Sequence, residues 1–178
     1  MALLAEELVE EWLNRQGYFT ISGIKLGVDE IDLLAIKTSE DGTVKCRHIE
    51  VQASINPISY LTSVSKEMQK QGRKLNSAKK RTKEELLKSV EEWVEKKFFK
   101  KRKVELKKQL SPKEWTTELV INIVKHDEEI EAIRSKGISV FYLKDIIREL
   151  KEEKFLVASA SGADFVNLIN MNVAVDED

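Results

Sequence analysis

The sequence predicts an α/β protein with a mixed β-sheet, helices on both faces of the sheet, and a long basic helical insert. Three observations carry this prediction. Two apolar runs flank a turn that contains Asp41-Gly42, which is typical of a β-hairpin. The chain after residue 118 alternates short apolar runs with helical patterns, as parallel strand–helix–strand units do. Between these parts, residues 63–110 have helical patterning and many basic side chains.

The first part of the chain is expected to form a helix and three strands. Residues 3–16 carry an amphipathic apolar stripe that ends at Gly17, so we expect a helix there. Residues 18–24, 31–36 and 45–52 are expected to be strands. The last two should pair as antiparallel neighbours across the hairpin.

Capping residues and the spacing of apolar residues predict the helices and strands of the basic section and of the C-terminal part. Thr82-Lys83-Glu84-Glu85 is a capping-box sequence that opens a long second helix, whose apolar stripe reaches Phe98. Ser111-Pro112 indicates a further helix start. Strands are then expected at 119–124 and 138–143, and helices at 127–135, 144–152 and 163–171. We expect one domain over 1–178, with 63–110 as a basic helical insertion and 156–178 as a C-terminal extension.

Composition limits the class of protein. Hydrophobic residues make up 42% of the 178 residues, and 30 basic side chains nearly balance 31 acidic ones, as in a soluble globular protein. The single cysteine, Cys46, excludes an internal disulfide framework and a CxxC zinc site. No apolar run reaches 18 residues, and acids follow the N-terminal apolar residues at once. We therefore expect neither a signal peptide nor a membrane span, and a cytoplasmic location.

The two strands of the hairpin carry acids where a core strand should not. Carboxylates among Ile, Leu and Val are costly to bury unless a cation meets them. Side chains alternate along a strand, so His48, Glu50 and Gln52 share one face. Asp32 lies in the neighbouring strand, so Asp32 and Glu50 can converge on one divalent ion together with a backbone carbonyl. The alternative is that Asp32 begins an edge strand and Glu50 faces solvent.

These acids stand in an order that resembles the PD-(D/E)XK nuclease superfamily, above all its Holliday-junction-resolvase-like and restriction-endonuclease-like cores. The resemblance covers residues 1–55, and its motifs are Glu6, Gly17-Tyr18, Glu30-Ile31-Asp32-Leu33 and Ile49-Glu50-Val51-Gln52. It implies a restriction-endonuclease-like fold and Mg²⁺ or Mn²⁺ as cofactor. It also implies a metal site made by Asp32, Glu50 and Val51, and catalytic roles for Glu6, Asp32, Glu50 and Gln52.

One position departs from the superfamily pattern, which has lysine where this chain has Gln52. Glutamine is neutral, so it cannot act as a point charge or a proton acceptor, although it can hydrogen-bond a water molecule. Some members of the superfamily are similar in carrying glutamine there, and others supply the lysine from an adjacent helix. Candidates in the following segment are Lys66, Lys70 and Lys74, with solvated surface lysines as the alternative.

The histidines are weaker candidates. His48 shares a face with Glu50 and could contact the site, but a packed strand histidine is the simpler interpretation. His126 precedes Asp127-Glu128-Glu129, where a role at a helix start accounts for it.

Charge is unevenly distributed along the chain. Residues 66–108 contain 17 Lys or Arg against 7 Asp or Glu. Such a segment suits contact with a phosphate backbone, whereas Glu–Lys pairs on a solvated helix are the alternative. The expected nucleic-acid contacts are nine basic side chains: Lys70, Lys74, Lys79, Lys80, Arg81, Lys100, Lys101, Arg102 and Lys103.

We therefore expect a Mg²⁺-dependent endonuclease that acts on DNA, of a structure-directed or of a restriction or repair type. The sequence does not separate DNA from RNA. A catalytically inactive nuclease-fold protein that binds nucleic acid or a protein partner is the alternative, which Gln52 favours. A third interpretation is a structural interaction protein that docks through its charged helix. A symmetric homodimer would let a nuclease cut two strands, and the apolar stretch 165–175 could form it.

Overall fold

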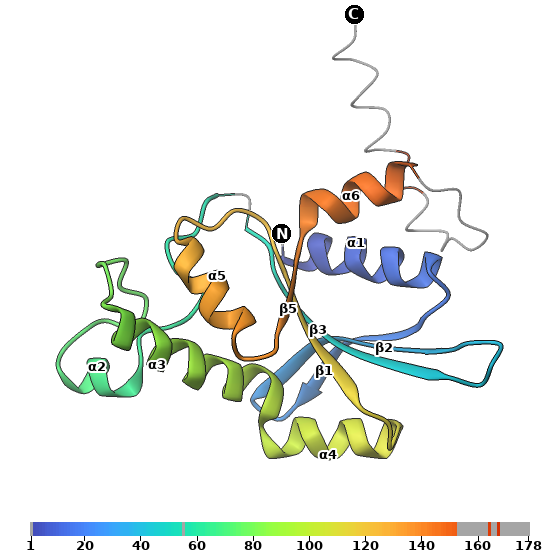
Figure 1. The fold of residues 1–178 in the computed structure, drawn as a ribbon, viewed down its shortest axis with the longest axis horizontal. Coiled ribbons are helices and arrows are strands. Elements are labelled where there is room, and N and C mark those ends of the chain that lie inside the picture. The colour runs from blue at the N-terminus through green and yellow to red at the C-terminus, as the bar shows by residue number, and fades with distance from the viewer. Residues whose placement is uncertain (1, 55, 153–163, 165–166, 168–178) are drawn as a thin grey trace, which may run out of the picture.

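The computed structural model describes residues 2–54, 56–152, 164 and 167, and these form one five-stranded mixed sheet flanked by helices (Figure 1). The strands are β1 (Phe19–Leu26), β2 (Asp29–Thr38), β3 (Val44–Gln52), β4 (Trp115–Ile121) and β5 (Ser139–Tyr142), and they lie in this order. β1, β2 and β3 pair antiparallel, whereas β3, β4 and β5 pair parallel. The expected α/β class with a mixed sheet is confirmed.

The expected hairpin between β2 and β3 is present. Its ladder pairs Leu33 with Ile49 and Leu34 with His48. Gly42 adopts a φ of 79° in the turn, a conformation that glycine reaches without a Cβ clash. The Thr43 N–H donates a hydrogen bond of 2.9 Å to the Asp41 side chain, which closes the turn.

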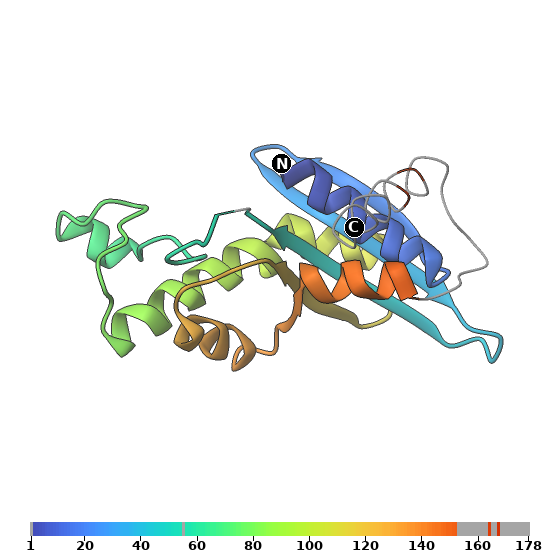
Figure 2. The ribbon, with the colours of Figure 1, turned by 90° about the horizontal axis from the view of Figure 1, so that it is seen from above.

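Helices cover both faces of the sheet and enclose a core on each side (Figures 1 and 2). They are α1 (Ala2–Arg15), α2 (Lys66–Lys70), α3 (Lys83–Val94), the π-helix η1 (Glu95–Phe99), α4 (Lys101–Leu110), α5 (Asp127–Arg134) and α6 (Leu143–Glu152). On the face of α1 and α6, Leu13 and Ile146 pack with Ile49 in one core. On the other face, Phe98 and Ile133 pack with Leu119 in a second core.

The second part of the basic insertion differs from the long helix that the sequence predicts after Thr82. The capping box is confirmed, because Glu85 N–H donates to the Thr82 hydroxyl while the Glu85 carboxylate accepts from Thr82 N–H. After Val94 the helix widens into η1. Lys100 then adopts an extended conformation with ψ of 137°, which breaks the helix before α4 begins.

The helix start expected at Ser111-Pro112 is wrong. Ser111 ends α4, since its N–H still donates to the Lys107 carbonyl, and β4 begins four residues later at Trp115. Proline is also common just past a helix end, because it cannot continue the helix. The β-forming residues Thr116 and Thr117 extend the strand earlier than the apolar run indicates.

Three expectations concern the C-terminal part of the chain. The helix at 163–171, the extension at 156–178 and the dimer surface at 165–175 lie outside the described residues, apart from residues 164 and 167. Elsewhere in the described ranges, no helix has the length and the apolar character needed to cross a membrane.

Glu129 of α5 forms hydrogen bonds with the segment after β3 that contains Leu61 and Thr62, and this gives a testable prediction. Its wholly buried carboxylate accepts hydrogen bonds from the N–H groups of Leu61 and Thr62 and from the Thr62 hydroxyl, at 2.8, 2.9 and 2.6 Å. Glu129→Ala would leave these buried donors unpaired, so we expect a loss of about 3 kcal/mol in the free energy of unfolding. Urea denaturation measures it, with Glu131→Ala, an exposed acid of the same helix, as the control. Equal losses in both variants would contradict this role.

Candidate functional site

Asp32 lies at the point where the β2–β3 ladder ends. Its Oδ2 accepts a hydrogen bond of 2.7 Å from the backbone N–H of Val51. This contact places the carboxylate against the end of β3, next to Glu50, as the alternation of the two strands predicts. Burial and, to a smaller extent, the charge of Glu50 raise the pKa of Asp32 to about 6, against the opposing effects of the Val51 N–H and Lys97.

Glu50 is wholly buried on the face of the sheet covered by η1 and α4. Its Oε2 accepts a hydrogen bond of 2.7 Å from the Lys97 ammonium group, and its Oε1 accepts one of 2.9 Å from Lys103. The ring Nε2 of His48 lies 3.1 Å from the same Oε1. Burial by itself would raise the pKa of Glu50, but the hydrogen bond from His48 and the charges of Lys97 and Lys103 lower it below its usual value.

The lysines that meet Glu50 come from the basic insertion. Lys97 lies in the middle of η1, and Lys103 lies in the first turns of α4. Lys103 also donates to the carbonyl of Lys97 at 2.7 Å, so one ammonium group holds both Glu50 and the backbone of the π-helix. Burial lowers the pKa of Lys97, but the attraction of Glu50 and Asp32 outweighs this effect and raises it above the usual value. We refer to Asp32, His48, Glu50, Lys97 and Lys103 as the acid–lysine cluster.

A further lysine fixes the tautomer of His48. The Lys107 ammonium group lies 3.3 Å from His48 Nδ1 and 3.3 Å from the Phe98 carbonyl. An ammonium group only donates, so Nδ1 accepts and Nε2–H donates to Glu50. Burial lowers the pKa of His48, which keeps the ring neutral. Burial and the neighbouring Lys103 lower the pKa of Lys107 to about 8.

Glu6 of α1 lies close enough to this cluster to interact with it electrostatically. Burial raises the pKa of Glu6, and repulsion from Glu30 and Glu50 adds to the increase, while Lys97 opposes it. Glu6 also contributes to the raised pKa of Asp32. The helix acid, the β2 acid and the β3 acid of the sequence motif therefore share one electrostatic environment.

The residues present fit a divalent cation. In the part of the chain that the structure describes, no three His, Cys, Asp or Glu side chains are grouped to hold a metal. Mg²⁺ usually needs only one or two carboxylates, because water and substrate phosphates complete its octahedron. The pKa of Asp32 is raised by burial and by the like charges of Glu50 and Glu6, so a cation beside its carboxylate would lower the energy of the ionised form.

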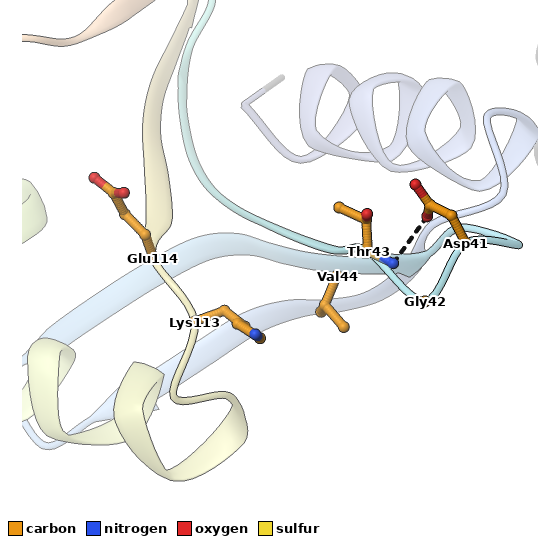
Figure 3. A pocket seen from close by; sticks show the side chains of 6 residues that line it. All are labelled: Asp41, Gly42, Thr43, Val44, Lys113 and Glu114. Atoms are coloured by element: carbon orange, nitrogen blue, oxygen red, sulfur yellow. Dashed lines mark hydrogen bonds between the residues drawn. The ribbon is translucent and has the colours of Figure 1, made fainter.

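Gln52 and Lys97 line a cavity of about 690 Å³ between the end of β3, α2 and the α3–η1 helix. We call it the lysine-rimmed cavity, because Lys66, Lys96 and Lys100 line it as well. Lys66 is thus near the site, but Lys97 is the lysine that is hydrogen-bonded to Glu50. A second pocket, of about 470 Å³, lies at the hairpin turn between Asp41 and Lys113 (Figure 3). It is at the other end of β3, roughly 25 Å along the strand from Gln52.

The nine basic residues expected to bind nucleic acid have different surroundings. Six are exposed on α2, on the loop that follows it and on α4: Lys70, Lys74, Lys79, Lys80, Lys101 and Arg102. Lys100 is half-buried and pairs with Asp29 at 2.5 Å. Lys103 is buried in the acid–lysine cluster. Arg81 is buried too: it donates to the hydroxyl and the carbonyl of Thr62 and stacks on the Tyr60 ring.

Sequence reasoning did not name Lys97 or Lys107, and it assigned Lys103 to nucleic-acid contact, whereas Lys103 donates to Glu50. Lys103 and Lys107 are spaced i, i+4, so they lie on one face of α4. His126 precedes α5 as expected, and its ring stacks on Tyr60 with 4.5 Å between the centroids.

The fold and the cluster define an α/β protein whose sheet carries carboxylates paired with lysines at the end of its central strand. No family model and no curated protein matches the sequence. The crystal structure of a protein of unknown function, AF1548, is similar to this chain, with a TM-score of 0.41 and 15% sequence identity. The match covers 80% of this chain and 58% of that one, so the chain spans less than two thirds of the length of AF1548.

Proposed function

We propose that the protein is a magnesium-dependent nuclease of the PD-(D/E)XK type, with a restriction-endonuclease-like fold, that hydrolyses phosphodiester bonds in DNA. The observation that carries this proposal is the contact between Lys97 and Glu50 beside Asp32. The sequence motif lacks its lysine because Gln52 stands in that position. Lys97 supplies an ammonium group to the same acids from a different element, the π-helix η1.

Asp32, Glu50 and the carbonyl of Val51 would hold the ion. Mg²⁺, or Mn²⁺, would neutralise charge on the phosphate and make a water molecule more acidic. Glu6, which interacts with both acids, would support a second ion or accept a hydrogen bond from that water.

The side chains around the ion would bind the phosphodiester and stabilise the charge that develops on it. In hydrolysis a water molecule loses a proton to the solvent as its oxygen bonds to phosphorus, the bond from phosphorus to the leaving oxygen breaks, and the leaving oxygen takes up a proton from the solvent. Lys97 would donate to a non-bridging phosphate oxygen and stabilise its growing charge. Gln52 would orient the attacking water by a hydrogen bond. His48 and Lys103 would keep Glu50 in position.

The exposed lysines of the insertion would bind the DNA backbone. The candidates are Lys70, Lys74, Lys79, Lys80, Lys101 and Arg102, and the half-buried Lys100, which pairs with Asp29, is a further one. Arg81 and Lys103 are left out of this contact set because their cationic groups are buried. Binding of this kind does not depend on sequence and weakens steeply with salt.

A second candidate function is a nuclease-fold protein that binds nucleic acid, or a protein partner, without cutting. One observation favours it: both carboxylate oxygens of Glu50 already accept hydrogen bonds from ammonium groups. A carboxylate that is neutralised in this way does not need a metal ion.

The experiment that tests the proposal is cleavage of labelled DNA by the wild-type protein. The substrates are a branched junction, a duplex and a single strand, each incubated with Mg²⁺, with Mn²⁺ or with EDTA. We expect cutting that requires metal and stops with EDTA. Binding that decreases with salt, without cutting under any of these conditions, would instead establish the second candidate.

Lys97→Met tests the residue on which the proposal depends. We expect a fall of about 10²-fold in the single-turnover rate, with little change in substrate affinity, because the ammonium group acts on charge that develops only in the transition state. The control is Lys45→Met, an exposed lysine of β3 near the hairpin. An unchanged rate in Lys97→Met, with metal-dependent cutting intact, would remove Lys97 from the mechanism.

A further inference from the structure

The lysine-rimmed cavity has walls of two chemical kinds. Four cations line it: Lys66, Lys96, Lys97 and Lys100. Two carboxylates, Glu92 and Glu95, share the wall, so cations outnumber acids in the lining, and two of these cations, Lys97 and Lys100, are paired with Glu50 and Asp29 outside it. Glu92 is moreover occupied, because it accepts a hydrogen bond of 2.9 Å from the backbone N–H of Lys66.

The remaining wall is apolar. Leu61, Val64, Leu75 and Trp93 contribute to it. Three of them are buried beneath the surface, whereas Leu75 is 50% exposed. A cavity with an apolar wall and a cationic rim suits a ligand that combines a flat, weakly polar group with a phosphate, which is the description of one nucleotide.

We propose that this cavity takes the unpaired end of a DNA strand, so that the substrate is a single strand or a flap rather than continuous duplex. This inference rests on the proposed function, because Lys97 belongs both to the cavity and to the acid–lysine cluster. If a phosphate of a DNA strand lies at Asp32 and Glu50, a neighbouring nucleotide of that strand would therefore reach the cavity.

The size of the cavity supports an unpaired strand. A volume of about 690 Å³ is in the range of pockets that enclose a small molecule. The bases of a duplex are stacked and paired, and taking one out costs a few kcal/mol. An end or a flap has no such cost, so the cavity gives these substrates an advantage that a smooth basic surface would not give.

The test measures binding in Ca²⁺ or EDTA, so that it does not depend on cutting. The probes are a fluorescent 20-nucleotide single strand, the matching blunt duplex, and a duplex with a short unpaired flap. Leu75→Glu places a carboxylate in the cavity at a half-exposed position where a charged side chain is tolerated. Leu87→Glu is the matched control, because Leu87 is an exposed leucine of α3 that does not line the cavity.

We expect Leu75→Glu to weaken binding of the single strand and the flap by about tenfold or more, as loss of a stacked or buried base does, and to leave the duplex within about twofold. Leu87→Glu should change none of the three.

The inference would be overturned if Leu75→Glu weakened binding of all three probes equally or of none. It would also be overturned if the wild type bound the duplex as tightly as the single strand. Selective binding without cutting would reject the proposed nuclease and retain this site. Metal-dependent cutting of all substrates that is unchanged in Leu75→Glu would support the proposed nuclease and reject the cavity as a strand-binding site.

Discussion

Asp32→Asn is expected to remove cleavage and, at the same time, to stabilise the fold at alkaline pH. Loss of a carboxylate that holds the metal should lower the rate by at least roughly 10³-fold. The stability effect has the opposite sign, because the site buries a carboxylate next to Glu50 and Glu6. Asparagine keeps an oxygen that can accept from the Val51 N–H, but it carries no charge.

The pH range of this effect follows from the direction of the pKa shift. The pKa of Asp32 is raised to about 6 in the folded protein, above the ordinary value of 3.8. The folded state therefore holds the proton more tightly than the unfolded chain does. Below the unfolded pKa, Asp32 does not lower the free energy of unfolding. As pH rises toward 6, ionisation of Asp32 lowers the free energy of unfolding progressively, and above that pH the loss stays constant. A shift of this size corresponds to at most about 3 kcal/mol.

Urea denaturation in EDTA at pH 8 and at pH 4 measures the effect. We expect Asp32→Asn to be more stable than the wild type by about 2 kcal/mol at pH 8 and by only about 0.6 kcal/mol at pH 4. Asp41→Asn is the control, because the Thr43 N–H lowers the pKa of that exposed acid, so its substitution should bring no gain at pH 8. A loss of stability in Asp32→Asn at pH 8 would show that the carboxylate has a structural role.

Lys103→Met is expected to destabilise the protein more than any exposed lysine does. Lys103 is 2% exposed, and it donates both to Glu50 and to the backbone carbonyl of Lys97. Methionine has a similar length but leaves a buried carboxylate with one cation fewer. Removing one partner of a buried ion pair costs about 3 kcal/mol or more. Lys108→Met, an exposed lysine of the same helix, is the matched control.

A double-mutant cycle separates the ion pair from packing. Glu50→Gln combined with Lys103→Met removes both charges, so we expect it to recover at least half of the stability lost in Lys103→Met. The loss in Lys103→Met should also depend on pH. Since the pKa of Glu50 is lowered in the fold, its ionised form stabilises the protein above pH 4.5, and this contribution disappears as pH falls through the folded pKa. Additive losses that do not change with pH would attribute the effect of Lys103 to packing.

Local signals predicted most of the fold. The Asp-Gly turn, the alternation in β2 and β3, and the capping box at Thr82 each depend on a few neighbouring residues, and all three are present in the structure. The break at Lys100 was not predictable in this way. The apolar stripe through Phe98 continues the helical period, and it is tertiary contact with Glu50 and Asp29 that holds Lys97 and Lys100.

The candidate site was also predictable only where local sequence patterns define it. Strand alternation was enough to bring Asp32 to the end of β3 near Glu50, because both lie on β-strands joined by a short turn. The lysine partners of Glu50 lie 47 and 53 residues away in sequence, so no local pattern connects them. Lysines of the nearer helical segment were the expected source instead. A run of basic residues is usually a solvated face, and the sequence does not indicate which members of Lys96–Lys108 are buried.

The π-helix has a consequence for how this protein should be compared with others. A π-turn contains one residue more than an α-turn, and each residue of an α-helix rotates the chain by about 100°. Deleting Phe98 or Phe99 would therefore turn α3 relative to α4 and carry Lys97 away from Glu50, although every charged residue of the segment would be retained. Here chain length, as much as residue type, positions the ammonium group. In a related sequence that keeps all the acids but is one residue shorter or longer in this segment, we expect no lysine in the position of Lys97 beside Glu50.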